Sequence, residues 1–259
     1  MLTLLIQTAK IEPIQYDPEC PFKYNNFVYR ITLPSPPSAG ANNGSHGTHQ
    51  PGTAPLPEGI NEFIMRLTNP DAEGMHANTR VENEVAMISL AAAALRDFRP
   101  HIVPAVYGWG TASLPSSQGW ILQELMPGVP MGEAFENMPF GEKKTVLAQM
   151  ARILKALQDF QLPSSIDHYG GVTFDSRGHI VSTAMTSVGS GPWLLYEEYF
   201  RNRLTRALQE ADNNPYIKGW HANGVRKRLE AFIESGVPAH FRALDHKDDR
   251  TIIHADFSK

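Results

Sequence analysis

The residues best suited to chemistry lie near the end of the chain, where His254, Ala255 and Asp256 follow a short β-branched run. The run Thr251–Ile253 predicts a strand, and Asp256 would lie just after its C-terminal end. A carboxylate in that position can accept the proton of a substrate hydroxyl. A His-x-Asp triplet is common by chance, so its meaning depends on the residues that the fold brings beside it.

Two charged side chains upstream, Arg66 and Glu84, could complete such a site. Arg66 lies inside a predicted strand, and Glu84 borders the apolar face of a predicted helix. Phosphoryl transfer needs a cation on the phosphates, a carboxylate that positions this cation, and a carboxylate near the nucleophile. Arg66, Glu84 and Asp256 supply these groups in order. The competing interpretations are a surface cation at a strand end for Arg66 and an ordinary solvated helix residue for Glu84.

The composition excludes several other classes of protein. With 259 residues, of which 42% are hydrophobic and 19% charged, the chain is typical of a globular protein with a sizeable core. Its net charge of -4 disfavours a nucleic-acid partner. A single cysteine, Cys20, excludes an internal disulfide and a cysteine-based metal cluster. No apolar run approaches the ~18 residues of a membrane span and no signal peptide is evident, so a cytoplasmic location without a membrane partner is predicted.

Hydrophobic periodicity divides the chain into a strand-rich part and a helical part. Strands are predicted over Tyr24–Leu33, Glu62–Leu67, Ile102–Trp109 and Trp120–Met126, with one helix over Asn78–Arg96. Further helices are predicted over Glu142–Phe160, Leu195–Glu210 and Val225–Glu234. The change near residue 126 predicts two lobes, 1–125 and 126–259, with a crevice between them in which a ligand could lie.

The helix predicted over Asn78–Arg96 determines where Glu84 would point. Its apolar stripe consists of Val81, Val85, Ile88, Ala92 and Leu95. At about 100° per residue, Glu84 lies about 60° from the centre of the stripe and can border the core. Glu82 lies about 100° away on the other side and is predicted to face water.

A low-complexity insert, Pro34–Gly59, interrupts the first lobe. It is rich in proline, glycine, serine, asparagine and histidine and has almost nothing to bury, so a disordered loop is predicted. His46 and His49 lie three residues apart in this insert, but no third ligand accompanies them, which favours a polar loop over a metal site.

Six segments, taken in order, resemble the aminoglycoside phosphotransferase family, whose fold is kinase-like, and the likeness is closest to fungal members. They are Asn25–Arg30, Phe63–Leu67, Arg80–Val85, Val103–Gly110, Gly119–Met131 and Ile252–Ser258. The resemblance implies an α+β, two-lobed, protein-kinase-like fold. Residues 1–125 would form a strand-rich nucleotide-binding lobe, and residues 126–259 an incomplete helical C-terminal lobe.

The resemblance also implies roles in nucleotide binding. Asn25 and Asn26 would form a turn over the phosphates of ATP. Arg66 would bind these phosphates, with Glu84 as its ion-pair partner. Backbone groups for the adenine ring would come from a hinge formed by Glu124, Leu125 and Met126. The alternative for Glu124 is a solvent-facing side chain beside a turn.

For the catalytic step, the resemblance implies that Asp256 is the base and that His254 holds the backbone of the loop. The acceptor would be a hydroxyl of a small molecule, with an amine-bearing metabolite as one option. Glu197, Glu198 and Asp212 could line an acidic pocket for such an amine, although exposed helix carboxylates are the simpler interpretation.

The Mg²⁺ ligands of the family, an Asn and a later Asp, would lie beyond Lys259, so no residue of this chain is assigned to a metal. The prediction is therefore an ATP-dependent phosphotransferase that is impaired by truncation after the catalytic-loop Asp. The alternative is a non-catalytic, pseudokinase-like protein that binds a nucleotide or a partner.

Overall fold

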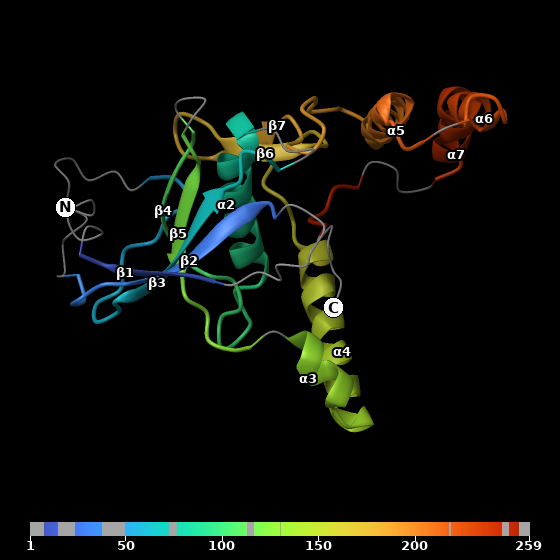
Figure 1. The fold of residues 1–259 in the computed structure, drawn as a ribbon. Coiled ribbons are helices and arrows are strands. Elements are labelled where there is room, and N and C mark those ends of the chain that lie inside the picture. The colour runs from blue at the N-terminus through green and yellow to red at the C-terminus, as the bar shows by residue number, and fades with distance from the viewer. Residues whose placement is uncertain are drawn as a thin grey trace.

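A five-stranded antiparallel sheet forms the first part of the protein. The computed structural model describes residues 8–14, 24–37, 50–72, 77–112, 117–129, 131–217, 219–244 and 249–253. The strands are β1 (Lys10–Pro13), β2 (Asn26–Thr32), β3 (Glu62–Thr68), β4 (Val106–Gly110) and β5 (Trp120–Glu124). Their spatial order is β1-β2-β3-β5-β4, so β3 is the central strand (Figure 1).

Helices dominate the second part. They are α3 (Met131–Asn137), α4 (Phe140–Asp159), α5 (Tyr196–Asn213), α6 (Val225–Ala231), a π-helical turn (Phe232–Gly236) and α7 (Val237–Arg242). A two-stranded hairpin, β6 (Gly171–Phe174) and β7 (Ile180–Thr183), separates α4 from α5. Helices α5 to α7 lie at the end of the molecule remote from the sheet (Figure 1). The α+β class, with strands first and helices second, is confirmed, whereas the division at residues 125 and 126 stays a prediction.

The described helices include none with the length and apolar character that crossing a membrane requires.

The two faces of the sheet bury different partners because side chains alternate along each strand. On one face, Ile31, Leu33, Phe63 and Leu122 form a buried cluster, with Tyr29 packed against it. Tyr29, Ile31 and Leu33, from the predicted strand Tyr24–Leu33, thus lie on one face of the sheet. The other face carries Ile121, which meets helix α2 (Ala77–Ala94).

Helix α2 forms as predicted but ends earlier, at Ala94, and buries a wider arc than the predicted stripe. Val81 and Val85 are buried as expected, whereas Ala92 is exposed. Ala86 and Leu90 are buried instead, because α2 packs against the β6 hairpin as well as the sheet.

Glu82 does not face water, contrary to the prediction. Its carboxylate accepts a hydrogen bond of 2.5 Å from the hydroxyl of Thr173 in β6. The neighbouring Asn83 donates to the carbonyl of Val172 at 3.0 Å. A helical-wheel argument could not foresee this side of α2 as covered, because the covering strand lies about 90 residues further along the chain.

The prediction of a disordered insert is wrong for residues 50–59, of which residues 50–54 lie along the edge strand β4. The indole N–H of Trp109 donates to the carbonyl of Pro51 at 2.9 Å, and the β4 backbone accepts a 2.7 Å hydrogen bond from the same segment. An edge strand leaves backbone groups unpaired, and this segment satisfies them. His46 and His49 lie outside the described residues.

Candidate functional site

Arg66 and Glu84 form an ion pair that joins the central strand β3 to helix α2. Arg66 pairs across the sheet with Ile121, so both side chains project from the face that α2 covers. The two charged side chains are 26% and 25% exposed, which leaves the pair accessible to a ligand. The predicted pairing is confirmed, and neither residue is an isolated surface charge. Its role in phosphate binding stays a prediction.

Arg80 supplies a second cation and was not predicted as a site residue. It lies one helical turn before Glu84 and is only 4% exposed. Its guanidinium donates to the carbonyl of Asn25 and, at 2.9 Å, to the side-chain oxygen of Asn26. A weaker contact of 3.4 Å reaches the carbonyl of Asn69. The four-residue spacing between Arg80 and Glu84 was the available signal, since such pairs lie on the same face of a helix.

The electrostatics of these three groups favour an anion. Burial lowers the pKa of Arg80 below its usual value, while attraction to Glu84 opposes this shift and repulsion from Arg66 adds to it. A guanidinium nevertheless stays protonated at neutral pH. Two cations therefore share one carboxylate. Among the described residues, the buried Nε of Arg80 also has no hydrogen-bond partner.

The carboxylate of Glu124 binds the loop before β4 and does not face solvent. It accepts a 3.0 Å hydrogen bond from the backbone N–H of Ala105 and lies 2.9 Å from Nε2 of His101. The backbone N–H of Glu124 donates to the Ala105 carbonyl at 2.8 Å. These contacts hold residues 101–105 as a loop, so β4 begins at Val106 and not at the predicted Ile102.

The backbone of Leu125 and Met126 remains available for a ligand. Within the described ranges neither residue makes a backbone hydrogen bond. The N–H of Glu124 is already engaged by Ala105, which leaves the next two residues as the part of the hinge suited to an adenine ring. The hinge role itself stays a prediction.

His254 and Asp256 lie outside the described residues, so their catalytic roles stay predictions. The segment that leads to them, 249–253, is held against the end of α4. There the hydroxyl of Thr251 donates to the carbonyl of Gln158 at 2.9 Å. The predicted strand over residues 251–253 is wrong, because no described strand pairs with this segment.

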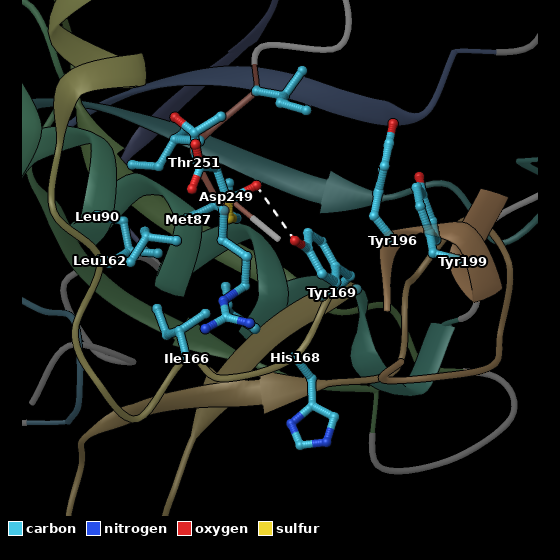
Figure 2. Close-up of a pocket in the computed structure, with 16 residues that line it drawn as sticks. Met87, Leu90, Leu162, Ile166, His168, Tyr169, Tyr196, Tyr199, Asp249 and Thr251 are labelled. Carbon is cyan, nitrogen blue, oxygen red and sulfur yellow. Dashed lines mark hydrogen bonds between the residues drawn. The ribbon is translucent and has the colours of Figure 1, made fainter. Parts of the chain in front are cut away.

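A cavity of about 300 Å³ opens beside this segment (Figure 2). Its walls come from α2, residues 162–170 before the hairpin, the start of β6, α5 and residues 249–253, and most lining side chains are aliphatic or aromatic. Tyr169, Tyr196 and Tyr199 form the aromatic wall, and the Tyr169 hydroxyl donates to the Asp249 carbonyl at 3.4 Å. Met87, one turn beyond Glu84 on α2, lies on the opposite wall. The cavity is as large as the smaller ligand pockets of proteins.

The three carboxylates considered for an acidic pocket do not come together. Glu197 and Glu198 occupy the first turn of α5, whereas Asp212 lies near its end. Fourteen residues of α-helix correspond to about 21 Å. Asp212 is also engaged by Arg226, whose Nε lies 3.0 Å from the carboxylate.

The resemblance implies two bound groups, ATP and Mg²⁺, and the described residues fit them unequally. The two positive charges of Arg66 and Arg80 exceed the single negative charge of Glu84, and this balance fits an anionic group such as the phosphates of ATP. By contrast, the described ranges contain no group of three or more His, Cys, Asp and Glu side chains that could hold a metal ion. None of the described residues is therefore assigned to Mg²⁺.

Comparisons with known proteins identify the family. No curated protein matches the chain. One solved structure of the bifunctional kinase-methyltransferase WbdD is 18% identical, with 73% of this chain and 43% of that chain covered and a TM-score of 0.21. A second WbdD structure is also 18% identical, with 91% and 55% covered and a TM-score of 0.22. The chain thus spans about half the length of these proteins.

A family model gives the assignment that these structures do not. The model described as the phosphotransferase enzyme family matches residues 56–259, which include β3, α2 and the terminal His254 and Asp256. This match confirms the family that the ordered sequence segments predicted. The chain belongs to the phosphotransferase enzyme family.

Proposed function

We propose that this chain binds ATP with Arg66 on the phosphates and transfers the γ-phosphoryl group to a hydroxyl of a small molecule. The observation that supports the proposal most directly is the Arg66–Glu84 ion pair on the central strand. Glu84 holds the guanidinium in place, and the charge of Arg80 keeps the site net positive. A guanidinium fixed in this way can donate two parallel hydrogen bonds to a phosphate.

The transfer step assigns one further group, the carboxylate of Asp256. The acceptor oxygen forms a bond to the γ-phosphorus as the bond from that phosphorus to the bridging oxygen of ADP breaks. The hydroxyl proton passes to Asp256. Arg66 stabilises the negative charge on the phosphates during this exchange.

The acceptor is proposed to lie in the cavity of Figure 2. One wall of this cavity consists of residues 249–253, and Asp256 follows three residues later in the sequence. The apolar lining suits an acceptor with a hydrophobic body. The three tyrosine rings could also hold an amine of the acceptor through cation–π contacts.

Nucleotide binding tests this proposal before any acceptor is known. Titration calorimetry with ATP should show that Arg66→Gln raises the Kd at least about tenfold, equivalent to about 1.4 kcal/mol. Arg30→Gln is the matched control, because it breaks the exposed 2.6 Å pair with Glu62 on the same sheet. ATP affinity that is equal in wild type and Arg66→Gln would contradict the proposal.

Transfer is then followed as ADP release across a panel of hydroxyl compounds. Turnover that Asp256→Asn abolishes without a change in the Kd for ATP is the expected result. Tight ATP binding without transfer to any compound would instead favour the non-catalytic nucleotide-binding alternative.

A further inference from the structure

We propose that Arg80 is a positioning residue that fixes the turn Tyr24–Asn26 to helix α2, so that the turn and Glu84 keep a constant spacing across the nucleotide site. The consequence for ATP rests on the function proposed above. The attachment of the turn to α2 rests only on contacts between described residues. The attachment and its effect on ATP binding can therefore be tested separately.

Arg80 and Asn69 hold the turn from two sides. The carbonyl of Asn25 accepts one hydrogen bond from the Arg80 guanidinium and another, at 3.0 Å, from the backbone N–H of Asn69. The side-chain amide of Asn69 donates to the carbonyl of Tyr24 at 2.8 Å. Arg80 in turn reaches the side chain of Asn26 and the carbonyl of Asn69. The start of β2, the end of β3 and helix α2 are thereby joined through one buried guanidinium.

The two attachments of α2 lie on the same face of the sheet. Asn26 stands opposite Thr68, and Val28 stands opposite Arg66, so Asn26 and Arg66 project to the same side of neighbouring strands. On α2, Arg80 and Glu84 are separated by four residues, or about 6 Å along the axis. Arg80 and Glu84 lie on successive turns of helix α2. Arg80 therefore binds the Tyr24–Asn26 segment, and Glu84 binds Arg66, from the same rigid helix.

The geometry requires a guanidinium and not merely a positive charge. The two Nη groups of Arg80 reach three acceptors, on Asn25 and Asn26 at the start of β2 and on Asn69 just after β3. A lysine has all of its donors on one nitrogen and cannot span these acceptors in the same way. Because Arg80 and Asn69 are both buried, water has little access to replace a lost donor. Arg80→Lys should therefore release the turn while it keeps the charge.

Hydrogen exchange of the Asn69 amide reports on the attachment directly, since its acceptor is the Asn25 carbonyl that Arg80 also holds. In Arg80→Lys this amide should exchange about tenfold faster. The neighbouring Thr68 amide, bonded to the carbonyl of Gly119 at 2.8 Å, should exchange at the wild-type rate. Unchanged exchange at Asn69, or equal acceleration at both amides, would overturn the proposal.

ATP affinity reports on the consequence. The Kd for ATP should rise about tenfold in Arg80→Lys and by a similar factor in Asn26→Ala, with no further rise in the double variant. Arg206→Lys is the control, because Arg206 also donates to a backbone carbonyl, that of Val188, but on helix α5. Multiplicative effects of the two substitutions would show that Arg80 does not act through the turn.

The two proposals fail in different ways. If wild-type protein binds no ATP, the proposed nucleotide site is wrong, and the exchange rates of Asn69 and Thr68 still decide whether Arg80 holds the turn. If ATP binds but Arg80→Lys alters neither exchange nor affinity, the nucleotide site stands and the positioning role is refuted.

Discussion

The sheet with α2 and the helical part after residue 131 differ in how completely they bury their apolar side chains. Val85 and Phe63, with 0% and 2% exposure, lie at the centre of the first part. In the second part, Phe140 is 84% exposed, and Leu147, Leu229 and Phe232 are also exposed. Tight packing fixes side-chain positions. The first part is therefore the one that can hold charged groups in the fixed geometry that a phosphate site needs.

Two ion pairs, one in each part of the molecule, also differ in their surroundings. The side chains of Arg66 and Glu84 are 26% and 25% exposed, and those of Arg226 and Asp212 are 20% and 26% exposed. Their exposure is thus nearly equal. The first pair joins a central strand to a helix beside a second buried guanidinium, whereas the second pair joins two helices at the far end of the molecule (Figure 1).

The largest expected effect follows from the difference in burial. Phe63→Ala should lower the free energy of unfolding by about 3–5 kcal/mol, because it removes a ring from a packed core. Phe140→Ala is the matched control in the helical part and should change it by no more than about 0.5 kcal/mol. Urea denaturation of both variants measures the two values. Similar losses would mean that the two parts do not differ in packing as their exposure indicates.

The ion pairs provide the next test. Glu84→Gln leaves Arg66 and Arg80 without their shared carboxylate and should cost about 1–2 kcal/mol, less than a fully buried pair because solvent screens part of the repulsion. Asp212→Asn should lower the melting temperature by less than Glu84→Gln does, since the described residues place no second buried guanidinium beside Arg226. About 1 M salt should reduce the cost of Glu84→Gln. A larger loss in Asp212→Asn would reverse the comparison.

The sequence predicted best where local periodicity and burial agree. The central strand and α2 were found from their apolar patterns, and this placed Glu84 close enough to the core to pair with Arg66. The role of Arg80 could not be predicted in the same way, because its partners Asn26 and Asn69 lie at the start of β2 and just after β3. No local pattern specifies such a contact, although the i,i+4 spacing to Glu84 gave a hint.

Other errors have the same origin in long-range packing. The hairpin β6–β7 was not predicted, and the hydrogen bond between Glu82 and this hairpin was missed as a result. Residues 50–59 were assigned to a disordered insert because their composition is polar, yet residues 50–54 lie along the edge strand β4. Composition describes what a segment can bury by itself, and an edge strand can supply partners that the segment lacks.

The smallest expected effect concerns Tyr107 and the carboxylate of Glu124. Burial raises the pKa of the Tyr107 hydroxyl, and the negative charge of Glu124 raises it further. The neutral form is thus favoured in the folded protein, so its contribution to stability is complete below the unfolded pKa of about 10 and is lost as pH rises through the higher folded pKa.

Tyr107→Phe should therefore lose less stability than the wild type when the pH is raised above about 10, as followed by urea denaturation at each pH. The ring should keep its edge-to-face contact with Phe63, at a centroid distance of 5.7 Å, so the variant remains folded. Tyr216→Phe, at a side chain that is 91% exposed in the helical part, is the control and should follow the wild-type curve. If both variants follow that curve, the Tyr107 hydroxyl is not held neutral by its surroundings. The tight packing of the sheet would then not extend as far as Glu124 at the end of β5.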